Sequence, residues 1–343
     1  MRVCQPVLAQ ILLTFRLIPS DHILIVPTIN NHRHVSIMRY SLTAWHPSPY
    51  LLLVLTTLFW SGNFVLGRAV HTVFTPFTLS FWRWAVALAI LLPFVWSSLH
   101  NQAPIIRRHG LILLLLSILG VVNFNTFVYI GLQSTTATNA LIMLSVTPVL
   151  IVALSFLLLR QTVTAWQGLG ILLSLAGVLV IVGRGEVGAL LARQFNPGDL
   201  WVLAAVTSWA LYSVCLRWRP AGLQPLNFQT TTILIGLVIL TPLYGWDLAQ
   251  GRTVAINAAT VGSILYLALF ASILAYVFWN RAVAELGANR TGQFLHLMPV
   301  FGAVLSMIFL GERLYGFHAA GIALIALGIW LATVYGRIRA MDR

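Results

Sequence analysis

Ten hydrophobic stretches follow one another along this chain, with only short polar segments between them. Each is roughly 17 to 23 residues long, which is the length that a helix rising 1.5 Å per residue needs to cross about 30 Å of hydrocarbon. The pattern predicts an all-α integral membrane protein with ten transmembrane helices. The predicted cores are Tyr50–Gly67, Pro76–Trp96, Leu111–Leu132, Ala137–Leu159, Trp166–Val182, Leu200–Leu216, Phe228–Tyr244, Val261–Trp279, Gly292–Leu310 and Phe317–Tyr335.

The charge content supports a membrane protein and excludes a soluble one. Only 8% of the 343 residues are charged and 59% are hydrophobic, whereas soluble domains carry about 25% charged residues. The net charge of +13 comes from twenty basic residues against seven acidic ones, and every basic residue is arginine. Such an excess first suggests a nucleic-acid binder, but that function needs the cations gathered on one surface.

The arginines instead follow the predicted topology. With the amino terminus inside the cell, fourteen of them fall on the cytoplasmic side, five fall outside and Arg83 lies within a span. This asymmetry satisfies the positive-inside rule, so both termini are predicted to be cytoplasmic and no nucleic-acid partner is expected. The cytoplasmic set is Arg2, Arg16, Arg33, Arg39, Arg107, Arg108, Arg160, Arg217, Arg219, Arg281, Arg290, Arg337, Arg339 and Arg343, and the outer set is Arg68, Arg184, Arg193, Arg252 and Arg313.

The second half of the chain repeats the first. A shift of 149 residues superposes Trp60 on Trp209 and Pro93 on Pro242, and a shift of 151 superposes Pro148 on Pro299. Because each copy holds five spans, the second enters the membrane from the opposite side, which predicts two inverted five-helix repeats suited to alternating access. The predicted parts are a first repeat at 49–183, a periplasmic connector at 184–199, a second repeat at 200–336 and a cytoplasmic tail at 337–343.

The first 37 residues differ from the rest. A short apolar run is interrupted by Arg16, Pro19 and Asp21, so neither a span nor a signal peptide fits. We expect residues 1–37 to be an extension without a fold. Met38 offers an alternative start, so this extension is a candidate for an untranslated segment.

Several ordered motifs resemble a known family. They are the stretch Leu58–Arg68 (LFWSGNFVLGR), Arg83, the two Pro-Val turns at Pro148 and Pro299, and Leu310–Arg313 (LGER) leading into Gly321. With this order, the chain from about Tyr50 to Tyr335 resembles EamA-type proteins of the drug/metabolite transporter superfamily. The resemblance implies a bacterial inner-membrane carrier that exports small metabolites such as amino acids or related amphipathic compounds. One departure is Arg160-Gln161 in the first copy, where the second copy has Gly311-Glu312.

A binding site between the halves should use polar and aromatic residues at span depth. Trp60 and Asn63 share one face of the first span with Phe64 and Gly67, and Trp209 and Tyr212 are their counterparts in the sixth. Aromatic rings with polar tips suit an amphipathic solute, although such residues also hold helices together in membranes.

Arg83 is the basic residue that falls inside a predicted span. A charge at mid-membrane costs about 2.5–3.5 kcal/mol on insertion scales, so such a residue usually faces a cavity or a partner. At some seven residues from the span end, about 10 Å, Arg83 could alternatively extend to the membrane surface. We expect it to line the pathway and to pair with a substrate carboxylate.

Asn125 and Tyr129, four residues apart in the third span, and His296 in the ninth complete the set of polar candidates. His296 could carry a proton or simply bond two helices. The substrate-binding residues predicted from the sequence are therefore Trp60, Asn63, Arg83, Asn125, Tyr129, Trp209, Tyr212 and His296.

Catalytic motifs are missing from the sequence. It holds no HExxH, GxSxG, P-loop or GxGxxG pattern, so we expect no enzyme, no catalytic residue, no metal and no cofactor, and only a small-molecule substrate and the bilayer as partners. All seven acids fall in tails, loops or helix ends by this assignment, which disfavours proton coupling through a buried carboxylate. The alternatives are a non-transporting membrane sensor and an intramembrane lipid-modifying enzyme.

Overall fold

The computed structural model describes residues 47–135, 140, 143–183, 185, 186, 188, 196–310 and 315–335, with the side chains of 306–310 and 334–335 left out. The chain divides into two units, Met1–Ser48 and Pro49–Arg343, and nearly all described residues belong to the second. The predicted extension at 1–37, most of the connector at 184–199 and the tail at 337–343 lie outside the described residues.

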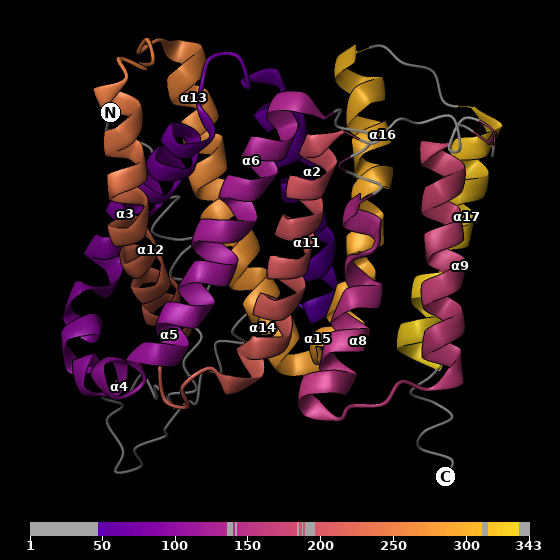
Figure 1. Ribbon diagram of the computed structural model, residues 1–343. Helices are drawn as coiled ribbons and strands as arrows, with labels where there is room; N and C mark the ends of the chain where they lie inside the picture. Colours follow the sequence, from indigo (N-terminus) through magenta and orange to yellow (C-terminus); the bar gives the residue numbers. More distant parts are fainter. Residues whose placement is uncertain are drawn as a thin grey trace, which may run out of the picture. The chain divides into compact units, whose positions relative to one another are not determined.

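Helices are the only regular elements in the described part of the chain (Figure 1). In chain order they are α2 (Pro49–Ala69), α3 (Pro76–Asn101), α4 (Ala103–Arg108), α5 (Gly110–Ser117), η1 (Ile118–Asn123), α6 (Phe124–Ser134), α8 (Thr147–Leu159), α9 (Ala165–Val182), α11 (Pro197–Cys215), η2 (Leu216–Trp218), α12 (Pro225–Ala249), α13 (Ala258–Tyr266), η3 (Leu267–Leu274), α14 (Ala275–Leu286), α15 (Ala288–Gly292), η4 (Gln293–His296), α16 (Leu297–Leu310), α17 (Gly316–Trp330) and η5 (Leu331–Tyr335).

Eight helical segments of the described chain are long and apolar enough to cross a membrane. This confirms an all-helical membrane protein, and the eight segments correspond to all the predicted spans except the fourth and the ninth. They are Pro49–Ala69, Pro76–Asn101, Gly110–Ser134, Ala165–Val182, Pro197–Trp218, Pro225–Ala249, Ala258–Leu286 and Gly316–Thr333.

The fourth and ninth predicted spans are shorter because each is interrupted just before a proline. In the fourth, the apolar helix covers Met143–Leu159, and α8 proper begins with Pro148 in its first turn. In the ninth, the tight turn η4 precedes α16, which has 14 residues and carries Pro299 near its start. Proline has no amide hydrogen and is tolerated in the first turn of a helix, so both helices start afresh there.

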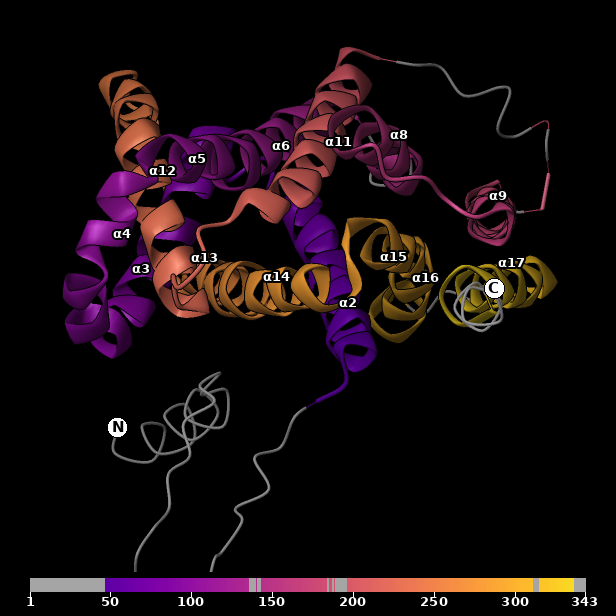
Figure 2. The ribbon, with the colours of Figure 1, turned by 90° about the horizontal axis from the view of Figure 1, so that it is seen from below.

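The halves pack in a matching pattern. α9 lies against α17 and α3 against α12, while the contact of α6 with α11 is matched by that of α14 with α2, and the contact of α8 with α11 by that of α16 with α2. Figure 2 shows α9 and α17 together at one side of the bundle. Each contact in one half therefore has a counterpart in the other.

Glycines bring α9 and α17 unusually close. A Cβ added to Gly170 would lie 2.5 Å from the carbonyl oxygen of Gly328, and one added to Gly177 would lie 2.7 Å from that of Gly321. The earlier glycine of α9 thus meets the later glycine of α17, so the two helices run antiparallel. Small residues at such crossings let helix backbones approach closely.

The third span and its counterpart each contain a π-helical segment, η1 and η3, and the 149-residue shift superposes their first residues, Ile118 and Leu267. The wider turn leaves carbonyl oxygens free to accept from side chains of other helices. The oxygen of Gly120 accepts from the hydroxyl of Tyr276 at 2.5 Å, and that of Ala271 accepts from the indole N–H of Trp60 at 3.1 Å. Both bonds join the two halves at the centre of the bundle.

Candidate substrate-binding site

Arg83 lies fully buried at the meeting point of four helical segments. Its Nε donates to Ser272 Oγ at 2.8 Å, and its Nη1 donates to Asn125 Oδ1 and to the Tyr129 hydroxyl, both at 2.6 Å. A longer contact of 3.3 Å joins Nη1 to Asn63 Oδ1. Because every one of these bonds points into the bundle, the alternative that Arg83 extends to the membrane surface is wrong.

The second terminal nitrogen of Arg83, Nη2, is buried and has no hydrogen-bond partner among the described residues. The ion pairs found in that part of the chain join Arg252 to Asp247 and Arg281 to Glu285, so none involves Arg83. Neutral oxygens alone solvate this cation, together with the Trp84 ring at 5.1 Å from the guanidinium carbon. A buried charge in this condition is costly, and an anion at Nη2 would lower that cost.

The groups around Arg83 are themselves linked. The Tyr129 hydroxyl donates to Asn63 Oδ1 at 2.8 Å, and Asn125 Nδ2 donates to the Tyr276 hydroxyl at 3.0 Å. We call Asn63, Arg83, Asn125, Tyr129, Ser272 and Tyr276 the Arg83 network. The first four belong to the first half and the last two to the second, so the network spans the interface between the repeats.

Beside the network lies a cluster of indole rings. The ring centroids of Trp60 and Trp209 are 4.8 Å apart, and those of Trp209 and Trp279 are 5.5 Å apart. Tyr276 connects the two assemblies, since its ring lies 5.3 Å from Trp209 and 5.1 Å from Trp84. The indole N–H groups of Trp209 and Trp279 are buried without a partner among the described residues. With Arg83 Nη2, they make three unpaired donors in the centre of the bundle.

A chain of neutral polar groups continues from the network. The Tyr212 hydroxyl donates to Asn280 Oδ1 at 2.8 Å, and Asn280 Nδ2 donates to Gln229 Oε1 at 3.3 Å. Gln229 Nε2 in turn lies 3.5 Å from the carbonyl oxygen of Ser272. Since Ser272 Oγ accepts from Arg83, this chain leads to the network.

The structure brings seven of the eight predicted residues into these assemblies, namely Trp60, Asn63, Arg83, Asn125, Tyr129, Trp209 and Tyr212. His296 lies elsewhere: its Nε2 is 2.9 Å from the carbonyl oxygen of Ser145 and its Nδ1 is 2.6 Å from Ser174 Oγ, so it fastens η4 to α9 and to the helical turn before α8. The sequence reasoning missed Gln229, Ser272, Tyr276, Trp279 and Asn280. Three of these five share one face of α14 at spacings of three and four residues, the same signal that identified Trp60 and Asn63.

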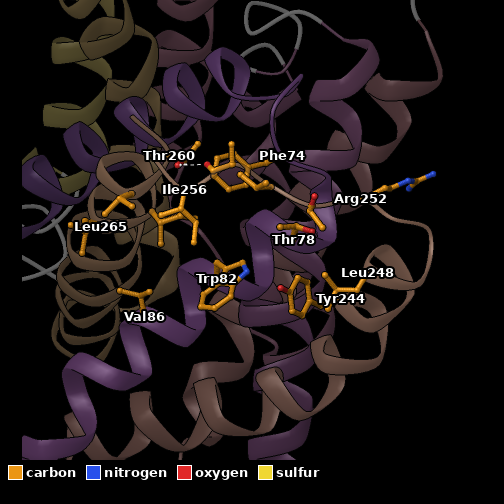
Figure 3. A pocket seen from close by; sticks show the side chains of 15 residues that line it. Phe74, Thr78, Trp82, Val86, Tyr244, Leu248, Arg252, Ile256, Thr260 and Leu265 are labelled. Atoms are coloured by element: carbon orange, nitrogen blue, oxygen red, sulfur yellow. Dashed lines mark hydrogen bonds between the residues drawn. The ribbon is translucent and has the colours of Figure 1, made fainter. Parts of the chain in front are cut away.

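A separate groove of about 440 Å³ lies between α3, α12 and α13. Figure 3 shows Phe74, Trp82 and Ile256 around it, with Arg252 pointing away from the space. Its lining is mostly apolar, and Arg83, although next to Trp82 in sequence, does not line it. This groove is therefore distinct from the polar site.

Two matching helical halves around a buried and incompletely paired cation are typical of secondary transporters. The chain belongs to the EamA-like transporter family, whose family model matches residues 47–183 and again residues 196–334. The double match confirms a two-repeat transporter and the resemblance seen in the sequence.

Named relatives agree with this membership. The uncharacterized transporter YyaM of Bacillus subtilis is 28% identical over 296 residues, 85% of this chain and 96% of its own. A probable amino-acid metabolite efflux pump of Salmonella typhimurium is 29% identical over 181 residues, which are 51% of this chain and 60% of the pump. A solved crystal structure matches with a TM-score of 0.67 and 20% identity, over 84% of this chain and 97% of that one, and supports the fold.

Proposed function

We propose that this transporter exports small carboxylated metabolites, amino acids or related amphipathic compounds, across the bacterial inner membrane, and that Arg83 binds the cargo carboxylate. The observation that carries the proposal is the unpaired Nη2 of a fully buried arginine. Nη1 is already engaged by Asn125 and Tyr129, which hold the guanidinium plane in place. A carboxylate arriving at Nη2 would form a charge-assisted bond with an oriented donor.

The rest of the site suits the body of an amphipathic cargo. Trp60, Trp209 and Tyr212 offer ring surface beside the network, and the free indole N–H groups offer further donors to acceptor atoms. The printed name of the Salmonella relative, an amino-acid metabolite efflux pump, favours the direction and the cargo class proposed here.

Alternating access is proposed to rest on two inverted repeats of five spans each. The matching contacts between the halves and the antiparallel crossing of α9 with α17 support the inversion. In this topology α8 and α16 supply the fourth and ninth spans, which makes ten. The excess of arginine on one side supports cytoplasmic termini.

Flux measurements in proteoliposomes test the proposal. Efflux of a radiolabelled panel of amino acids and simple carboxylates is compared between wild type, Arg83→Gln, Arg83→Lys and the control Arg290→Gln, which removes a half-buried arginine outside the Arg83 network. Losing one partner of a buried charged hydrogen bond costs about 2–5 kcal/mol, so Arg83→Gln should slow carboxylate flux at low concentration by about 100-fold.

Arg83→Lys keeps the charge without the planar donor pair and should also be slow. Wild-type rates in both Arg83 variants would overturn the proposal. A wild-type protein that moves no member of the panel would favour the membrane sensor.

A further inference from the structure

A second pocket, of about 610 Å³, opens between the ends of α11 and α14 near the lower edge of Figure 1. Its walls are η2, the segment 219–223, the last turn of α14 and the start of α15, with Leu159 and Gln161 at its side. Unlike the groove of Figure 3, it has a largely polar lining, which includes Ser213, Arg217 and Asn280.

The charge of this pocket is positive. Arg217 is exposed, whereas Arg219 is half-buried with its guanidinium carbon 5.9 Å from the Phe228 ring, and neither forms an ion pair with a described carboxylate. The acid in the lining, Glu285, accepts from Arg281 Nε at 2.6 Å and is thereby neutralised. Burial lowers the pKa of the Arg219 guanidinium, which shows that this cation has lost part of its hydration. The pocket therefore presents two uncompensated cations.

The pocket also reaches toward the Arg83 network. Asn280 lies in its lining and is bonded to Tyr212 and to Gln229. Gln229 contacts the backbone of Ser272, whose side chain accepts from Arg83. An unbroken series of hydrogen-bonding groups thus runs from the Arg219 end of the molecule to the unpaired cation in its centre.

We infer that this pocket is an anion-selecting vestibule, in which Arg217 and Arg219 hold the cargo carboxylate before it passes Asn280 and Gln229 to Arg83. A cleft lined by one sign of charge concentrates ions of the opposite sign by about 10- to 1000-fold. The inference rests on the proposed function in one respect, because the vestibule selects for the same carboxylate that Arg83 is proposed to bind.

Charge-selective thiol labelling tests the vestibule without requiring transport. In the full-length protein with Cys4→Ser and Cys215→Ala, one reporter is Ala284→Cys in the pocket lining, and the other is Ala258→Cys, exposed at the start of α13. Each reporter is labelled in detergent with an anionic sulfonate and with a cationic trimethylammonium methanethiosulfonate of similar size. The ratio of the two rates cancels differences in general accessibility.

The anionic-to-cationic rate ratio should be about tenfold higher at Ala284→Cys than at Ala258→Cys, and it should fall with added salt. Arg219→Gln should remove most of this preference, Arg219→Lys should keep it because the charge remains, and Arg290→Gln should keep it because that residue lies outside the pocket. Equal ratios at the two reporters, or a preference that survives Arg219→Gln together with Arg217→Gln, would overturn the inference.

Benzoate and benzamide serve as matched probes of the binding station. Sodium benzoate should slow labelling of Ala284→Cys by the anionic reagent, and benzamide, which has the same ring without the charge, should not. Equal effects of the two compounds contradict the station. If the preference is present while Arg83→Gln leaves flux unchanged, the proposed function fails and the vestibule stands; if flux depends on Arg83 while the preference is absent, the vestibule alone fails.

Discussion

Asn125→Asp should separate stability from transport, because it places a carboxylate of the same size directly against Arg83. The wild-type Oδ1 already lies 2.6 Å from Nη1 of that arginine. The substitution would therefore supply, within the protein, the anion that we propose the cargo brings. It should strengthen the folded centre and at the same time block the site.

The magnitude follows from the contacts of Asn125. Two unit charges 4 Å apart attract by about 4 kcal/mol at an effective dielectric constant of 20, before the cost of burying the new charge. Against this, the amide donations from Nδ2 to the Gly120 oxygen at 3.2 Å and to the Tyr276 hydroxyl at 3.0 Å are lost, at about 1–2 kcal/mol. Stability should stay at or slightly above that of wild type. An incoming carboxylate would meet a paired cation and a like charge, a loss of about 3 kcal/mol or more than 100-fold in affinity.

The assay combines thermal unfolding of the purified protein with carboxylate flux in proteoliposomes. The matched control is Asn227→Asp, an equally buried amide on α12 that is bonded to Ser98 and Gln102 instead of an arginine. The control should unfold at a lower temperature, because its new charge has no cation beside it. If Asn125→Asp is destabilised as much as the control and transports carboxylates at the wild-type rate, our account of the Arg83 network is wrong.

Two further predictions concern packing and coupling. Gly177→Ala should lower thermal stability by about 1–3 kcal/mol, since its Cβ would lie 2.7 Å from the Gly321 oxygen, whereas Gly168→Ala on the same helix meets nothing within 4 Å and should be close to neutral; similar melting temperatures for both would contradict the crossing. Efflux from proteoliposomes should persist without a pH gradient, because the buried acids of the described chain, Asp199 and Asp247, lie at helix ends and are bonded to threonines. Strict dependence on an imposed gradient would disprove this.

Much of the fold could be predicted because membrane helices are defined by length and apolarity alone. The approach fails where a span is broken: nothing in the hydrophobicity of 137–159 marks the interruption before Pro148, since apolar residues lie on both sides of it. The repeat shift identified Gly170 and Gly177 as counterparts of Gly321 and Gly328. It could not reveal that these counterparts pack on one another, because internal similarity carries no distances.

The site was predictable on one side only. Arg83 stands out in the sequence as a charge within a span, and Asn63, Asn125 and Tyr129 stand out as polar groups at similar depth. Their partners Ser272 and Tyr276 could not be assigned, because single serines and tyrosines are common in membrane helices and the sequence does not tell which spans meet at the centre. The unpaired state of Nη2 is visible only after every neighbouring oxygen has been placed.

The π-helical segments make the third span and its counterpart sensitive to changes in length. A widened turn holds one residue more than the regular helix would, and successive residues of an α-helix are turned by about 100°. Deleting one residue within 118–123 would therefore leave a regular helix while rotating everything after it, so that Asn125 and Tyr129 would turn away from Arg83. Relatives that differ by a single residue there would keep the same fold and present different side chains to the cargo.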